Sequence, residues 1–360
     1  SGAYGTGRQG KGKPMAEDLT RLFDLMDTLG RIARMMHPRR LDALAGLLGD
    51  RDDALRQTIG HGSSEQVRAA ATLALQACTG LRASLHADNP ILEALRAMRQ
   101  YSRAQEALTA LADILPEVGR YLLEPAYRDD PALLQRLAAP PHPDSGVFHF
   151  GNQTNERGGY SVFVPPWYDA TQPVPLIMAL HGGSGHGRLF LWNWVPEARS
   201  RGMIVVSATA TGRTWSLMEP EIDSQNLDAI LDKVGDRWNI DRNLTLLTGM
   251  SDGGTFTLLS GLAAESRFTH LAPAAASFHP LMLAVTDPER IAGLPIHLTH
   301  GAQDWMFPVD MARTAHRTLA AAGAAITYRE LADLPHAYPR DGQGEVLDWF
   351  TGEAHITGDG

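Results

Sequence analysis

The chain has 360 residues, of which 44% are apolar and 20% charged, and its formal net charge is −9. This balance predicts packed globular domains, excludes wholesale disorder and argues against nucleic acid or an anionic membrane as the main partner. The single cysteine, Cys78, excludes an internal disulfide framework, and its alanine-rich helical surroundings predict a small core residue. Because no apolar run approaches the ~20 residues that span a bilayer, we expect a cytoplasmic location without a membrane span and leave a processed N-terminus open.

The first part of the chain is predicted to be helical. Residues 1–14 are rich in glycine and lysine with no apolar segment behind them, so we interpret them as a flexible tail or an expression remnant. In residues 15–139 leucine, alanine and arginine recur at helical spacing without strand signals, which predicts a bundle of five to seven helices. No catalytic or metal-ligand pattern occurs there. The bundle is therefore expected to serve either as a lid over the second domain or as a module for homodimerisation.

A proline-rich linker at residues 140–146 separates this bundle from a different pattern, because repeated prolines cannot continue a helix. From residue 147 to 355, short apolar strands alternate with amphipathic helices. The expected strands cover residues 147–150, 160–164, 175–180, 203–207, 244–247, 270–277, 295–299 and 325–330. The expected helices cover residues 189–201, 223–238, 255–262, 288–292, 309–322 and 344–350. This repetition predicts an α/β fold with a mostly parallel sheet, helices on both faces, an antiparallel edge formed by the first two strands, and function at the carboxyl ends of the strands.

The stretch from Gly249 to Gly253 has the form G-x-S-x-G between an apolar strand and a helix. Such a turn exposes the hydroxyl of Ser251 at the end of the sheet. It needs glycine at both ends, because a Cβ there would collide with the neighbouring backbone. We expect Ser251 to be a nucleophile and the backbone N–H of Asp252 to receive developing negative charge at the helix N-terminus.

A glycine-rich loop, His181–Gly185, directly follows the strand at 175–180. Glycine lets backbone N–H groups approach a substrate closely, so Gly183 or Ser184 is expected to supply the second oxyanion donor. His181 is expected to orient this loop rather than to act as a base. A phosphate-binding loop is the rival interpretation, weakened because no lysine follows at the required spacing.

Two further loops carry an acid and a base. Asp304 lies just past the strand at 295–299, where a carboxylate can orient an imidazole, and His336 stands in a proline-flanked loop after the last strand. The order Ser251, Asp304, His336 is that of the nucleophile-elbow hydrolases, which predicts a Ser-His-Asp triad. His279 and His300 also follow strands, but neither comes after the acid in the chain. The residues expected to contact substrate are Trp215, Phe278, His279, Trp305 and Phe307.

Residues 145–352 resemble the α/β-hydrolases. The segment Trp238–Asn243 leading into TGMSDGG, together with the HGGSG and HGAQDWMFP loops, is similar to the feruloyl esterase and polyhydroxybutyrate-depolymerase-like group. The resemblance implies serine-dependent hydrolysis of carboxylic esters without a metal or cofactor. Members that act on extracellular polymers tend to be disulfide-bonded, and the family pattern has no helical first half, so a smaller soluble or lipid-like ester is expected here.

The motifs together predict a serine esterase that works through an acyl-enzyme. An oligopeptidase-like serine peptidase is the alternative, because it shares the elbow and the triad order, although such enzymes usually carry a β-propeller before the hydrolase domain. A non-catalytic binding protein on the same scaffold is the third interpretation, and it predicts a damaged triad.

Overall fold

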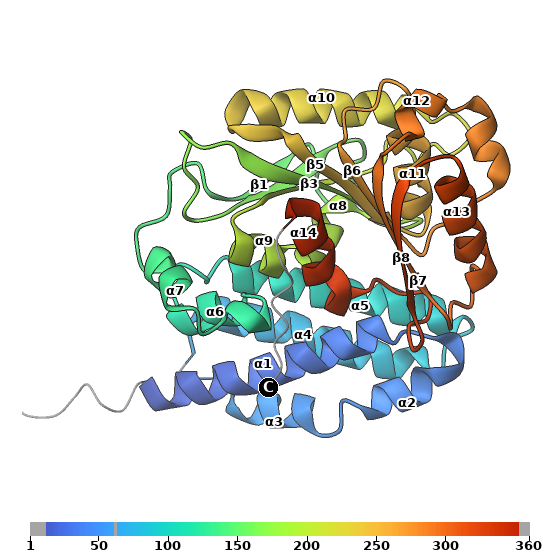
Figure 1. Cartoon of the computed structure of the whole chain (residues 1–360). Helices are drawn as coiled ribbons and strands as arrows, with labels where there is room; N and C mark the ends of the chain where they lie inside the picture. Colours follow the sequence, from blue (N-terminus) through green and yellow to red (C-terminus); the bar gives the residue numbers. More distant parts are fainter. Residues whose placement is uncertain (1–11, 61–62, 353–360) are drawn as a thin grey trace, which may run out of the picture. The chain divides into compact units, whose positions relative to one another are not determined.

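The computed structural model describes residues 12–60 and 63–352, and these divide into two compact units between Tyr121 and Leu122 (Figure 1). Most of the predicted tail lies outside the described residues, and Gly12 already begins the first helix. The last residues of the predicted second domain, 353–355, are also outside them.

The described part of the first unit is built of helices. They are α1 (Gly12–Arg34), η1 (Pro38–Arg40), α2 (Leu41–Gly46), α3 (Arg51–Thr58), α4 (Glu65–Ser84), α5 (Pro90–Thr109) and α6 (Pro116–Tyr121). Small side chains let α4 and α5 approach closely, since a Cβ on Gly80 would lie 2.7 Å from the Cβ of Ala97. Cys78 is buried in α4, and burial raises the pKa of its thiol to about 12. The prediction of a core cysteine is confirmed.

The second unit begins before the proline-rich run, with η2 (Pro125–Tyr127) and α7 (Pro131–Leu137). An ion-pair cluster joins this segment to the helices of the sheet. Arg201, whose side chain is 6% exposed, pairs with Glu124 at 3.1 Å and also with Asp348. The first compact unit ends at Tyr121, ahead of the predicted linker at residues 140–146. Within the described residues seven α-helices precede the first strand, as predicted.

One eight-stranded sheet forms the centre of the second unit, in the order β1-β2-β4-β3-β5-β6-β7-β8. Its strands are β1 (Gly146–Phe150), β2 (Tyr160–Val164), β3 (Val174–Leu180), β4 (Ile204–Ala208), β5 (Ile240–Met250), β6 (His270–Ala274), β7 (Pro295–Gly301) and β8 (Ala325–Leu331). Strand β2 is antiparallel to both β1 and β4, and every other pair is parallel. This is the α/β-hydrolase fold with the predicted antiparallel edge.

Helices connect the strands. They are α8 (Gly187–Phe190), η3 (Leu191–Asn193), α9 (Val195–Arg201), α10 (Glu221–Arg237), α11 (Asp252–Gly261), η4 (Pro280–Val285), α12 (Pro288–Ile291), α13 (Val309–Ala321), η5 (Arg340–Gly342) and α14 (Gln343–Thr351). The helix predicted over residues 189–201 is broken into three pieces. Pro196 lies in the first turn of α9, where its missing N–H costs no helical hydrogen bond, so the chain starts a new helix there.

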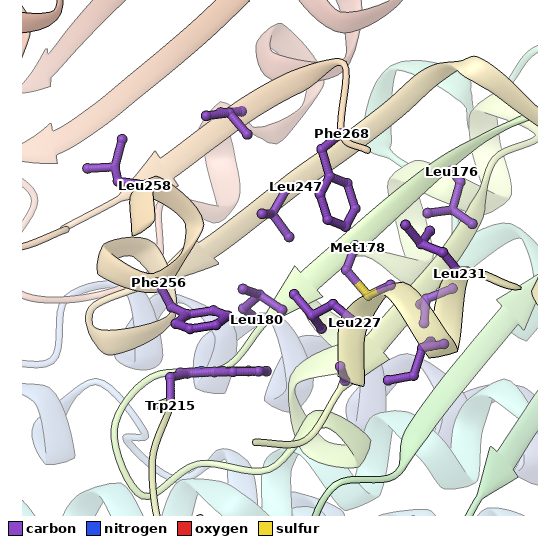
Figure 2. Packing of buried hydrophobic residues seen from close by; sticks show 14 of the residues in the cluster. Leu176, Met178, Leu180, Trp215, Leu227, Leu231, Leu247, Phe256, Leu258 and Phe268 are labelled. Atoms are coloured by element: carbon purple, nitrogen blue, oxygen red, sulfur yellow. The ribbon is translucent and has the colours of Figure 1, made fainter. Parts of the chain in front are cut away.

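Alternation along β3 produces two apolar layers. Leu176, Met178 and Leu180 point to one face, where they pack against α10 and α11, as Figure 2 shows. Ile177 and Ala179 point to the other face, toward α9 and α14. In Figure 1, α10 lies on one side of the sheet and α9 and α14 on the other. With both faces covered, the loops at the carboxyl ends of the strands are left to carry function.

Candidate active site

Ser251 stands at the junction of β5 and α11 in a backbone conformation that side chains rarely adopt, with φ 57° and ψ −121°. The flanking glycines make this turn possible. A Cβ on Gly249 would lie 2.5 Å from the carbonyl of Gly253, and one on Gly253 would lie 2.4 Å from the carbonyl oxygen of His181. The predicted need for glycine on both sides of the serine is confirmed, and strain of this kind is typical of functional positions.

The structure brings Ser251, His336 and Asp304 into one line. Oγ of Ser251 lies 3.0 Å from Nε2 of His336, and Nδ1 of the same ring lies 2.8 Å from Oδ2 of Asp304. The side chain of Asp304 is inaccessible to solvent, and that of His336 is 6% exposed. A hydroxyl, an imidazole and a carboxylate in this arrangement can move a proton from the serine to the ring while the acid fixes the tautomer.

Asp304 is held as an anion by its surroundings. Its Oδ1 accepts the backbone N–H groups of Met306 and Phe307, both at 2.8 Å, which leaves Oδ2 for His336. Burial acts to raise the pKa of this carboxyl, but the bonds from His336 and the two N–H groups outweigh burial and lower the pKa below its usual value. The carboxylate is therefore ionised at neutral pH.

The two other histidines considered for the base, His300 and His279, bond to backbone groups, although Nε2 of His300 also lies 3.5 Å from Oδ2 of Asp304. Nε2 of His300 donates to the carbonyl of Phe307 at 3.0 Å, so this buried ring fastens the loop that carries Asp304. Nδ1 of His279 accepts the N–H of Leu281 and caps η4.

The glycine-rich loop lies against the elbow. A Cβ on Gly182 would be 3.6 Å from the Cβ of Ser251, and one on Gly183 would be 2.8 Å from the carboxylate of Asp252. Ser184 has a positive φ of 56°. Asp252 is the first residue of α11, and the first N–H groups of a helix have no intrahelical partner. The backbone of Gly182 thus lies beside Ser251, and that of Gly183 lies beside the first residue of α11.

The side chain of His181 holds the 181–185 loop through two hydrogen bonds. Its Nδ1 donates to the carbonyl of Gly182 at 2.7 Å and its Nε2 accepts the N–H of Ala210 at 3.2 Å. Burial lowers the pKa of His181 to about 3, so the ring is neutral. Trp215 donates from Nε1 to the carbonyl of His181 at 2.8 Å. These bonds give His181 the orienting position predicted for it.

The aromatic residues expected at the site divide into two groups. Trp305 and Phe307 flank the ring of His336, with centroids 6.0 and 5.2 Å away, and Trp305 is 38% exposed. Trp215 and Phe278 are buried in the apolar layer, where Trp215 stacks on Phe256 in Figure 2. The buried ring of Trp215 therefore supports the 181–185 loop through its bond to the carbonyl of His181.

Residues 209–216, the loop after β4 that carries Trp215, also contact the start of α11, through a threonine for which the sequence predicted no role. Oγ1 of Thr214 donates to Oδ2 of Asp252 at 2.6 Å. Asp223, fully buried in the first turn of α10, accepts the N–H groups of Thr211 and Ser216, both at 2.8 Å. The sequence could not predict that Asp223 holds this loop. An acid at the start of a helix is common, and the groups that Asp223 binds are backbone N–H groups, which no residue type marks.

A cavity of about 630 Å³ lies between α10, α11 and η4 and is lined in part by Glu221, Leu258, Phe268 and Met282. Its lining does not include Ser251, Asp304 or His336. In the part of the chain that the structure describes, no three or more His, Cys, Asp or Glu side chains are arranged to hold a metal ion. Nor does any helix of residues 12–60 and 63–352 have the length and hydropathy for crossing a membrane.

Comparison with known proteins adds a family match. Residues 218–350 match the family described as Phospholipase/Carboxylesterase, a segment that contains Ser251, Asp304 and His336 but not the loop His181–Gly185. No curated protein matches the sequence.

Several solved structures are similar at the level of the fold. A thermostable esterase is 21% identical over 58% of this chain and 63% of its own, with a TM-score of 0.47. The acylaminoacyl peptidase of Pyrococcus horikoshii is 16% identical over 60% of this chain and 42% of its own, with a TM-score of 0.45. The fluorophosphonate-binding serine hydrolase F of Staphylococcus aureus is 13% identical over 57% of this chain and 96% of its own, with a TM-score of 0.44. This chain spans less than two thirds of the thermostable esterase. Residues 218–350 are thus similar in sequence to phospholipases and carboxylesterases, and the unit that contains them has the α/β-hydrolase fold.

Proposed function

We propose that the protein is a serine hydrolase that cleaves carboxylic esters, with Ser251, His336 and Asp304 as its catalytic triad. The observation that carries the proposal is the continuous line of contacts from Oγ of Ser251 through both ring nitrogens of His336 to Asp304, at 3.0 and 2.8 Å. The family match over residues 218–350 supports the same class of chemistry.

Acylation begins when Oγ of Ser251 attacks the ester carbonyl carbon and its proton passes to Nε2 of His336. The carbonyl oxygen becomes an oxyanion. When the bond to the alcohol oxygen breaks, His336 returns that proton to the leaving alkoxide, which departs as the alcohol. Asp304 keeps the proton on Nδ1 and stabilises the imidazolium between these two transfers.

Deacylation repeats the steps with water. His336 removes a proton from the water, whose oxygen attacks the acyl carbon, and the bond to Oγ then breaks as Ser251 regains the proton. The products are a carboxylic acid and the free enzyme, and no cofactor takes part in this sequence of steps.

The oxyanion donors in this proposal are the backbone N–H of Asp252 and that of Gly183 or Ser184. Each such donor contributes about 3–4 kcal/mol to transition-state stabilisation in comparable sites. On the other side of the serine, Trp305 and Phe307 form an apolar wall beside the ring that protonates the leaving group. This wall favours a small or lipid-like ester, in keeping with the resemblance to the feruloyl esterase and depolymerase-like group.

A peptidase would use the same triad. Helices, and not a β-propeller, precede the sheet in residues 12–60 and 63–145, which favours the esterase. Turnover of p-nitrophenyl butyrate should therefore exceed that of a peptide p-nitroanilide by orders of magnitude; the reverse ratio would identify a peptidase.

Labelling with a fluorophosphonate probe tests the serine. The wild type should label within minutes at neutral pH, while Ser251→Ala, with an unchanged circular dichroism spectrum, should not. A folded wild type that does not label would disprove the proposal. The role of the helical unit, as a lid or in homodimerisation, stays a prediction.

A further inference from the structure

The turn between β1 and β2, residues 151–159, is bound to the loops beside Ser251. The N–H of Gly158 donates to the carbonyl of Ala210 at 3.2 Å. Nε2 of His186, at the start of α8, donates to the carbonyl of Glu156 at 3.0 Å, and burial lowers the pKa of that ring, which keeps it neutral. A Cβ on Gly159 would lie 1.9 Å from the carbonyl oxygen of Gly151, so the turn closes tightly on itself. These bonds fix the turn against the loops that follow β3 and β4.

Arg157 extends from this turn and joins two separate loops. Its Nη1 donates to the carbonyl of Gly185 at 2.8 Å. Its Nε donates to the carbonyl of Gly212 at 2.7 Å, and its Nη2 to that of Arg213 at 3.1 Å. Three bonds from one planar guanidinium fix the two loops relative to each other, and bonds from a charged donor are about twice as strong as neutral ones.

Both loops lead directly to the proposed oxyanion donors. Gly185 is two residues from Gly183, whose backbone lies against the carboxylate of Asp252. Arg213 precedes Thr214, whose hydroxyl donates to that same carboxylate at 2.6 Å. The guanidinium therefore closes a ring of contacts that runs from the 181–185 loop through the start of α11 to the 209–216 loop.

We infer that Arg157 is a positioning residue that holds the backbone N–H donors of the oxyanion hole in place. The inference rests on the proposed function. Arg157 contacts no reacting atom in this scheme, so its loss should leave binding of the ground-state ester nearly intact and weaken binding of the transition state. A displacement of about 1 Å in such groups can cost about a hundredfold in rate.

The test compares Arg157→Ala and Arg157→Lys with the wild type, using kcat and KM for p-nitrophenyl butyrate and Ki for a trifluoromethyl ketone that forms a tetrahedral adduct. In Arg157→Ala we expect kcat to fall about 10- to 100-fold and Ki to rise in parallel, while KM changes less than about threefold. Arg157→Lys, which can reach fewer of the three carbonyls, should lie between. Millimolar methylguanidinium should restore part of the kcat of Arg157→Ala. The control is Arg317→Ala, which removes an exposed arginine on α13; its kcat should equal that of the wild type and should not change when methylguanidinium is added.

Unchanged kcat and Ki in Arg157→Ala would overturn the inference. If that variant does not fold, the decision passes to Arg157→Lys, where wild-type kcat and Ki would overturn it equally. Failure of the proposed function looks different, because the wild type and Arg317→Ala would then also lack turnover and fluorophosphonate labelling.

Discussion

The two sides of Ser251 are built in different ways. On one side the groups are side chains with their own chemistry: His336 and Asp304, each in a short loop after a strand. On the other side the proposed oxyanion donors are backbone N–H groups, and the loops that carry them are bonded by side chains such as His181, Thr214 and Arg157. The first side is specified by residue type, the second by how loops from distant parts of the sequence are tied together.

This difference decides what the sequence could predict. Ser251, Asp304 and His336 were found because serine, acid and histidine in that order, each after a strand, form a known pattern. Arg157 lies between the first two expected strands, where no motif singles it out. Its partners are carbonyl groups, which every residue has, so no residue type marks the contact.

The fold shows the same division. Short apolar runs alternating with amphipathic helices predicted the sheet, because strands that are buried on both faces are apolar along most of their length. Local backbone events were missed. The strand expected over residues 270–277 ends at Ala274, because Ala275 turns to a φ of +46°, and the helix expected over 189–201 restarts near Pro196.

The largest effect on kcat is expected from the side of Ser251 that is formed by His336 and Asp304. Asp304→Asn should lower kcat about 10⁴-fold, because an amide N–H facing Nδ1 favours the wrong tautomer of His336. The asparagine oxygen can still accept the N–H groups of Met306 and Phe307, so the loop should keep its shape. Asp310→Asn, at the exposed start of α13, is the matched control and should retain wild-type kcat. Equal activity in the two variants would remove Asp304 from the mechanism.

The next effect is on the stability of the fold and comes from His181, which holds the 181–185 loop. His181 has a pKa of about 3 in the fold, against about 6.5 in the unfolded chain. Between these values the unfolded state takes up a proton that the folded state does not, so stability falls as pH drops below about 6.5, by about 1.4 kcal/mol per pH unit.

Urea unfolding measures this effect. Between pH 7 and pH 5 the wild type should lose about 2 kcal/mol of stability through His181. The loss should be smaller by that amount in His181→Gln and unchanged in His316→Gln, a control on α13. Identical pH dependence in wild type and His181→Gln would show that the ring is not held neutral.

The smallest effect is expected from one hydroxyl. Thr214→Val keeps the shape of the side chain but removes the donor to Asp252. Because the carboxylate then constrains the 181–185 loop less, kcat should fall about tenfold with KM little changed. Thr171→Val breaks a similar bond to Asp169, of 2.7 Å, before the start of β3 and should have no effect on kcat. A purely raised KM in Thr214→Val would assign this threonine to substrate binding instead.

The covalent intermediate offers the most direct measurement. With p-nitrophenyl trimethylacetate, whose bulky acyl group deacylates slowly, acid quenching during turnover should trap an acyl-enzyme. Peptide mapping by mass spectrometry should find the acyl mass on the peptide that contains Ser251, and Ser251→Ala should show neither adduct nor burst of p-nitrophenol. An adduct on another residue, or undiminished turnover in Ser251→Ala, would show that Ser251 is not the nucleophile.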